Sequence, residues 1–279
     1  MMDSRLNERW VERFGLAPQD GAQPAGDEVL ARMLSRGTCR KFRADAVPEA
    51  LLQMLLACAQ SAPSKSDLQQ YSIVVVQDGA ARGQIASWLP AMPWVAAAPV
   101  FLVFCADTRR NQRVCEIRGR PHANNNLDTF LNATVDAALA MGAFITAAEG
   151  AGLGCCPISY VRNHLEEITP LLALPPGVFP VAGLCVGYPA ERAPVSMRLP
   201  PSLVIHRDRY DDRPLEDELD AYDRRRHARE PIPPEKQKNA RSYGTTVTCT
   251  WSDQVSRQLS LPERAEFRAF LQRHGFDLA

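Results

Sequence analysis

LDTFLNATVDAALAMGAFITAAE, residues 127–149, is the stretch of sequence that says most about the fold. It predicts a long helix that is apolar over most of its circumference. A helix of that kind lies either at the buried centre of a domain or against another subunit. Continuous apolar runs at residues 71–76, 100–105 and 178–186 are typical of strands whose two faces are both covered. The sequence therefore predicts a three-layer α+β or α/β arrangement with helices on both sides of a sheet.

The rest of the chain divides by its composition into three expected parts. Residues 1–27 form a charged, amphipathic N-terminal helical arm, and residues 28–212 carry the alternating helices and strands of the core. Residues 213–279 form a C-terminal helical extension with a charged helix, a mobile loop at about 230–248 and two closing helices. Ser260 and Glu263 form a capping-box pattern, which predicts the start of the last helix.

Charge and hydropathy limit the possible partners and location. The chain has 32 basic and 32 acidic residues, and this balance argues against a nucleic-acid partner. The N-terminus does not resemble a signal peptide. The most apolar stretch, residues 133–148, is interrupted by Asp136 and is too short to span a bilayer. We therefore expect a soluble, cytoplasmic protein without a membrane partner.

The cysteines and histidines do not predict a metal site. None of the eight cysteines forms a C-x-x-C pair, and several lie in apolar runs, so we expect reduced, buried thiols. The five histidines lack metal-ligand spacing. The sequence also lacks the motifs of serine hydrolases, zinc proteases and P-loop enzymes. The glycine cluster at 150–154 follows a helix, so it predicts a helix stop rather than a dinucleotide loop.

Two polar clusters could bind a ligand. Arg36-Gly-Thr-Cys-Arg40 places two guanidiniums and the Thr38 hydroxyl where they could grip a phosphate, or where they form a solvated helix face. The second cluster is a polar turn before a strand, or a set of donors that meets the polar edge of a planar ring. Its members are Ser64, Lys65, Ser66 and Gln69.

In combination and order these motifs resemble the nitroreductase family, in the branch of flavin reductase P and the oxygen-insensitive NADPH nitroreductases. The resemblance covers about residues 28–279 and implies a three-layer α/β/α sandwich with a central mixed sheet and a long buried helix. It also implies a homodimer with FMN at the interface. The residues carried over as FMN contacts are Arg36, Thr38, Arg40 and Arg198 for the phosphate, Ser64, Lys65, Ser66 and Gln69 for the ribityl chain and ring edge, and Pro157, Ile158 and Ser159 beside the ring.

The activity implied by the resemblance is a ping-pong transfer of hydride from NADPH or NADH, through FMN, to a small acceptor such as a nitroaromatic, a quinone or a flavin. No catalytic side chain is required. Arg225 and Arg229 could bind the 2′-phosphate of NADPH, or be solvated charges. Two alternatives remain open: a flavin reductase that supplies a partner oxygenase, and a non-enzymatic flavin-binding protein.

This chain departs from the branch pattern at several positions. Ser196 stands where a lysine is usual, so one positive charge near the cofactor is lost unless Lys65 or another residue replaces it. Met92 stands where the pattern has a glutamine, and Tyr160 where it has a small glycine, so both are candidate substrate contacts. Gly37 stands where a second arginine is frequent.

Overall fold

The computed structural model describes residues 4–17 and 28–279 and divides into two compact units. Unit 1 takes its described residues from 1–36 and 195–263, and unit 2 comprises residues 37–194 and 264–279. The division at 27 and 212 inferred from the sequence stays a prediction. Residues 1–3 and 18–27 of the expected arm lie outside the described residues.

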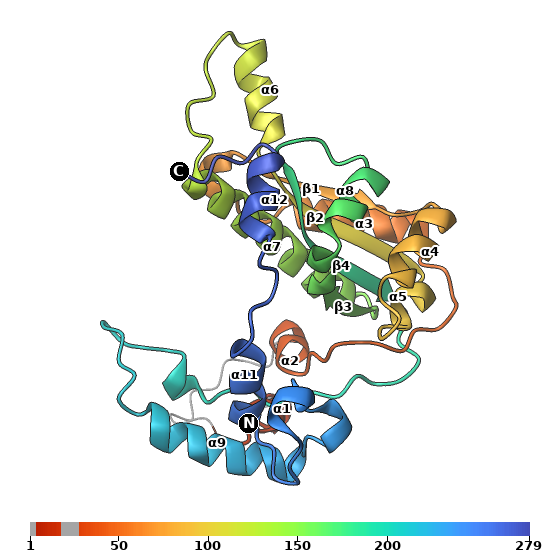
Figure 1. The fold of residues 1–279 in the computed structure, drawn as a ribbon. Helices are drawn as coiled ribbons and strands as arrows, with labels where there is room; N and C mark the ends of the chain where they lie inside the picture. The colour runs from red at the N-terminus through yellow and green to blue at the C-terminus, as the bar shows by residue number, and fades with distance from the viewer. Residues whose placement is uncertain (1–3, 18–27) are drawn as a thin grey trace. The chain divides into compact units, whose positions relative to one another are not determined.

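A four-stranded sheet forms the centre of unit 2 (Figure 1). Its strands lie in the order β1-β2-β4-β3, and the apolar runs predicted to be strands are confirmed as β1, β2 and β4. The bounds are β1 (Tyr71–Val75), β2 (Val100–Asp107), β3 (Gly154–Ile158) and β4 (Val178–Gly187).

Every strand pair in this sheet is antiparallel, so the expected mixed sheet is wrong for the described residues. The apolar runs indicated strands covered on both faces, and that pattern is also compatible with an antiparallel sheet between two helical layers. β4 is buried along its whole length, and β2 is buried at all but its first residue. Burial was therefore predicted correctly, but strand direction was not.

Helices cover both faces of the sheet, which confirms the three-layer arrangement. One core cluster joins the sheet to α3 (Glu49–Gln60), α7 (Leu127–Gly150) and α12 (Phe267–Arg273). The other joins it to α4 (Gly79–Ser87), α5 (Trp94–Ala97) and α8 (Leu165–Leu171). The remaining α-helix of unit 2 is α6 (Arg109–Ile117), and the unit also contains two short 3₁₀ helices, η1 (Lys65–Asp67) and η2 (Ser159–Asn163).

The long helix α7 buries only one of its faces. Its buried residues on the sheet include Ala137, Ala140 and Phe144, and the Phe144 ring meets Phe104 edge-on at 6.1 Å. α7 has 24 residues and is long and apolar enough to cross a membrane, so the length argument based on residues 133–148 does not hold. Its packing against the sheet instead supports its role as a core helix.

Unit 1 is helical in its described part. It contains α1 (Ser4–Phe14), α2 (Glu28–Leu34), α9 (Leu215–Arg229), α10 (Ala240–Tyr243) and α11 (Trp251–Leu259). Tyr222 of α9 meets Trp251 of α11 edge-on at 5.4 Å. The segment expected to be a mobile loop contains hydrogen-bonded turns, in which the backbone N–H of Thr246 donates to Gln237 Oε1 at 3.0 Å. Its mobility stays a prediction.

The predicted capping box at Ser260 is wrong. Ser260 ends α11, and its hydroxyl donates back to the carbonyl of Arg257 at 2.9 Å. The capping box of unit 1 is instead formed by Thr250 and Asp253 at the start of α11. Residues 261–266 follow Ser260 without forming a helix, and Arg264 there has a left-handed φ of 55°, so the sequence pattern had no helix start to cap.

We expect opposite effects from two glycine-to-alanine substitutions in unit 2. At Gly187 a Cβ would lie 2.5 Å from Cδ of Pro99, so Gly187→Ala should destabilise the fold by about 1–3 kcal/mol. At Gly83, inside α4, no atom lies within 4 Å, so Gly83→Ala should stabilise it by roughly 0.5–1 kcal/mol. Urea unfolding measures both, and equal stability of the two variants would contradict this packing.

Candidate functional site

The loop of residues 64–70, between α3 and β1, has an unusual backbone. Ser66, Asp67 and Gln69 have positive φ angles of 51°, 56° and 51°. A left-handed conformation costs a non-glycine residue roughly 1–2 kcal/mol. Three such residues within four positions persist only if surrounding groups fix the loop.

A buried carboxylate on α7 fixes this loop. Asp136 is 1% exposed, and its two oxygens accept the backbone N–H groups of Lys65 at 3.0 Å and Gln70 at 3.1 Å. Hydrogen bonds to a charged acceptor are the strong ones in proteins. From the sequence alone, Asp136 is visible only as an interruption of an apolar stretch. A lone acid on an otherwise apolar helix was the signal that could have identified it.

The beginning of α6 holds the other end of the loop. Arg110 donates from Nη1 to the carbonyls of Gln69 at 2.9 Å and Tyr71 at 3.0 Å, and the Asn111 amide donates to the carbonyl of Leu68 at 3.2 Å. With the backbone held on both sides, the side chains of Lys65, Ser66 and Gln69 are exposed, and that of Ser64 is half-buried. The predicted donor cluster is therefore a rigid, solvent-facing loop.

A second predicted segment runs beside the edge strand β3. The N–H of Cys39 donates to the carbonyl of Cys155 at 3.0 Å, and Gly154 leaves no room for a side chain because its Cβ would lie 2.6 Å from Cys39. This contact fixes Thr38 and Arg40 on either side of the buried Cys39. The Arg40 guanidinium lies 5.5 Å from the centre of the Trp94 ring.

The end of β3 presents the residues expected beside the ring. Pro157 and Ser159 are exposed, but the Ile158 side chain is buried in the core, so only its backbone would be available to a ligand. Of the two candidate substrate contacts, Tyr160 is 44% exposed and Met92 is partly buried against the core. Tyr160 is therefore the more accessible one.

Unit 1 brings Arg36 and Arg198 together through a residue that sequence reasoning missed. Arg13 of α1 is 6% exposed and donates to the carbonyls of Leu34 at 2.9 Å, Ser196 at 2.8 Å and Arg36. In return, the N–H of Arg198 donates to the carbonyl of Arg13 at 2.8 Å. Burial lowers the pKa of Arg13, and the positive charges of Arg198 and Arg36 lower it further. A cluster of this kind favours an anion.

The two candidate NADPH arginines differ in their contacts. Arg229 donates to Glu230, to the carbonyl of Glu12 at 2.6 Å and to that of Val195 at 3.1 Å, so its guanidinium is engaged in the fold. Arg225 has two buried nitrogens, Nε and Nη2, without a hydrogen-bond partner. Its assignment to an anionic ligand is the better supported of the two.

All eight cysteines are free thiols in the structure. Cys58 and Cys115 are partly exposed, and the other six are buried. Burial raises the pKa of Cys105 to about 12, which keeps it a neutral thiol. Among the described residues no three potential ligands gather as a metal site.

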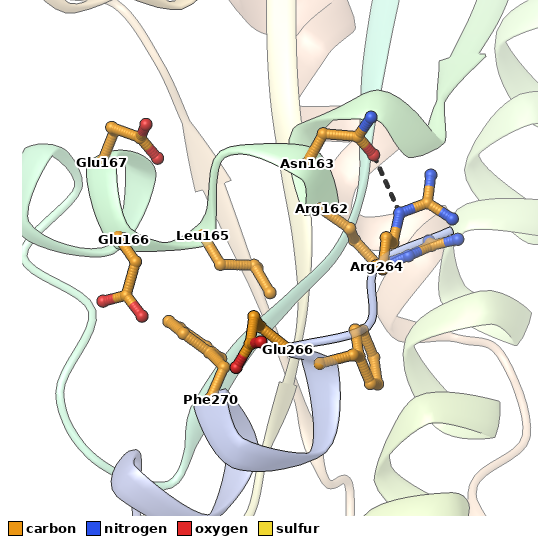
Figure 2. A pocket seen from close by; sticks show the side chains of 9 residues that line it. Arg162, Asn163, Leu165, Glu166, Glu167, Arg264, Glu266 and Phe270 are labelled. Carbon is orange, nitrogen blue, oxygen red and sulfur yellow. Dashed lines mark hydrogen bonds between the residues drawn. The ribbon is translucent and has the colours of Figure 1, made fainter. Parts of the chain in front are cut away.

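Unit 2 contains a cleft of about 350 Å³, and several of its charged lining residues bond to other parts of the unit (Figure 2). Arg162 donates to the carbonyl of Val181, Arg264 donates to Asn163 Oδ1 at 2.8 Å, and both arginines lie on the same side of the cleft. On the other side Glu166 pairs with Arg273 at 2.6 Å. These bonds tie α12 to α8 and its preceding turn, and the cleft contains none of the predicted cofactor residues.

We expect Asp136→Ala to destabilise the protein by roughly 3 kcal/mol, because two backbone N–H groups, that of Gln70 buried and that of Lys65 partly buried, would lose a charged acceptor. Asp128→Ala is the matched control on the same helix, because Asp128 is exposed and its carboxylate bonds only to Asn132. Asp128→Ala should lower the free energy of unfolding by less than about 1 kcal/mol. Urea unfolding measures the stability of both variants. If they lose equal free energy of unfolding, Asp136 does not anchor the loop.

Comparison with known proteins covers nearly the whole chain. The model of the nitroreductase family matches residues 33–188, and that of the nitroreductase family C-terminal domain matches residues 196–279. The FMN reductase [NAD(P)H] of Bacillus subtilis is 32% identical over 90% of this chain and 98% of that protein. The oxygen-insensitive NADPH nitroreductase of Salmonella typhimurium is 35% identical over 85% of this chain and 93% of that protein.

Solved structures agree with the fold. NfrA2 of B. megaterium has a TM-score of 0.82 at 30% identity and covers 91% of this chain and 100% of its own. The NADPH:FMN oxidoreductase of Vibrio harveyi, solved in complex with NAD+, has a TM-score of 0.75 at 28% identity, over 89% of this chain and 98% of its own. On the family models and on these relatives, the chain belongs to the nitroreductase family.

Proposed function

We propose that this protein is an NAD(P)H-dependent oxidoreductase that binds FMN and reduces small acceptors. The family match carries this proposal, because it covers both the sheet of unit 2 and the helices of unit 1. The relatives named as FMN reductases, nitroreductases and flavin oxidoreductases support the reaction class. The absence of a buried nucleophile among the candidate residues agrees with chemistry performed on a cofactor.

The side chains present fit FMN in their chemistry. In unit 1, Arg36 and Arg198 provide the charge for a phosphate, and their mutual repulsion with Arg13 is relieved by an anion. In unit 2, the loop of residues 64–70 offers hydroxyl, amide and ammonium donors on a fixed backbone. Bound FMN supplies hydride transfer, while the protein positions it and its substrates.

The donor loop has a second role in this proposal. Lys65, Ser66 and Gln69 would donate to the polar edge of the ring and stabilise negative charge there. Because Asp136 and Arg110 fix the loop before any ligand binds, these donors need little reorganisation. Pro157 and Ser159 would lie beside the ring, and Tyr160 would limit the size of the acceptor.

Steady-state kinetics test the proposed reaction. With FMN bound, we expect NADPH oxidation that depends on a quinone or nitroaromatic acceptor. Double-reciprocal plots at several acceptor concentrations should give parallel lines, because the nicotinamide leaves before the acceptor binds. Intersecting lines would contradict the ping-pong order, and a protein that does not bind FMN would contradict the whole proposal.

A flavin reductase that supplies a partner oxygenase remains a second candidate, since relatives carry the name FMN reductase. Exchange of bound FMN with labelled free FMN during turnover would favour it. A non-enzymatic flavin-binding protein would bind FMN without being reduced by either nicotinamide. We also propose a cytoplasmic location, supported by the eight free thiols.

We further propose a homodimer, supported by an exposed apolar stripe on α7. Leu131, Val135 and Leu139 repeat every four residues and are 57%, 46% and 41% exposed. Residues with this spacing share one helix face, opposite the face that packs on the sheet. Large exposed apolar faces of this kind mark association sites.

We expect Val135→Asp to convert the dimer to a monomer, because the stripe would have to bury a charge. Analytical ultracentrifugation measures the change. Ile117→Asp is the control, since Ile117 is 72% exposed but lies on α6. A Val135→Asp protein that stays dimeric would contradict this interface.

We expect Arg225→Gln to raise the KM for NADPH by about ten-fold, the loss of one charge-assisted contact, and to leave the KM for NADH unchanged. Arg224→Gln provides the control, because Arg224 is its exposed neighbour on α9. An equal change for both nicotinamides would exclude recognition of the 2′-phosphate by Arg225.

A further inference from the structure

Helix α1 of the N-terminal arm contacts the segments that carry Arg36 and Arg198, although it lies outside the residues that the family models match. The models begin at residue 33, so α1 and Arg13 lie outside the matched residues. Nevertheless Arg13 contacts the two segments that carry Arg36 and Arg198. One of its acceptors is the carbonyl of Ser196, the position at which a positive charge was expected to be missing.

The contacts of Arg13 leave its positive charge available to attract an anionic ligand. Its guanidinium donates to three backbone carbonyls, those of Leu34, Arg36 and Ser196, and forms no ion pair with any residue that the structure describes. Backbone carbonyls orient a guanidinium without removing its charge. The adjacent Glu12 pairs with Arg9 at 3.0 Å, and its negative charge raises the pKa of Arg13. Burial, Arg198 and Arg36 each lower that pKa more strongly than Glu12 raises it.

A positive charge in this position acts on the same ligand as Arg36 and Arg198. It is 6% exposed, so solvent screens its field less than that of a surface arginine. The Arg13 guanidinium donates to the carbonyl of Arg36, and the N–H of Arg198 donates to the carbonyl of Arg13 at 2.8 Å, so the three residues are neighbours in unit 1. Burial lowers the pKa of Arg13, and the charges of Arg198 and Arg36 lower it further. Three like charges held close together in a folded protein are relieved by an anion with more than one negative charge, such as a phosphate monoester.

We propose that Arg13 is a positioning residue of the FMN phosphate site: it fixes the Arg36 and Arg198 segments and supplies the positive charge that Ser196 does not. This inference rests on the proposed function. It predicts that the arm increases affinity for the phosphate of the flavin and has no effect on recognition of the ring.

A comparison of two flavins tests the inference. FMN and riboflavin share the ring and the ribityl chain, and only FMN has the phosphate. Quenching of flavin fluorescence by the apoprotein measures each dissociation constant. Arg13→Gln should weaken FMN binding by about ten-fold or more and change riboflavin binding less than about two-fold. Arg9→Gln, on the same helix and in a half-buried ion pair, should change neither.

A second variant separates charge from structure. Ser196→Lys in the Arg13→Gln background returns a positive charge to the phosphate site and should restore much of the FMN affinity. The salt dependence of FMN binding should fall in Arg13→Gln and return with the lysine.

Three outcomes would contradict the inference: unchanged FMN affinity in Arg13→Gln, equal weakening of both flavins, or no recovery with Ser196→Lys. Each of these leaves the proposed function intact as long as the unaltered protein binds FMN. Failure of the unaltered protein to bind FMN would instead remove the proposed function itself.

Discussion

The candidate site depends most on the hydrogen bonds that the Asp136 carboxylate accepts from the backbone of the loop of residues 64–70. α7 carries this carboxylate into the core, where it accepts two backbone N–H groups from a loop with three left-handed residues. Without that acceptor, two backbone N–H groups of the loop would lose their hydrogen-bond partner, and the strained backbone would no longer be held in place. The same helix packs on the sheet and exposes the apolar stripe. One element therefore fixes the core, the donor loop and the proposed interface.

Much of this architecture could be predicted from the sequence, because periodicity reports burial. The helix over residues 127–149 and the strands at 71–76, 100–105 and 178–186 were found with nearly correct bounds. Strand direction could not be predicted, because a strand between two helical layers is apolar in either orientation. The Ser260 capping pattern failed because a local motif does not show whether a helix follows.

The site was less accessible to sequence reasoning. Arg36, Ser64 and Gln69 were selected because their side chains can bind a ligand. Asp136 and Arg13 act on the backbone, and backbone acceptors or donors have no sequence signature. The Arg13 acceptors Leu34 and Ser196 lie 21 and 183 residues away along the chain. The Ile158 side chain belongs to the core, so its predicted role beside the ring rests on its backbone.

The two units provide different kinds of binding group for the proposed chemistry. Unit 1 concentrates positive charge at Arg13, Arg36 and Arg198, which suits a phosphate. Unit 2 provides neutral donors and an ammonium group on a fixed loop, which suits the polar edge of a ring. Neither unit contains a buried nucleophile among the candidate residues. These residue types agree with the proposal that the protein binds a redox cofactor and that the cofactor carries out the bond-making.

The most direct test of this account is anaerobic mixing of the FMN-loaded protein with one equivalent of NADPH, followed by absorbance at about 450 nm, the usual flavin band. The account predicts rapid bleaching, and recovery of the absorbance when a quinone or nitroaromatic is then added. Bound flavin that stays oxidised with both NADPH and NADH would contradict it and would leave a flavin-binding protein without reductase activity.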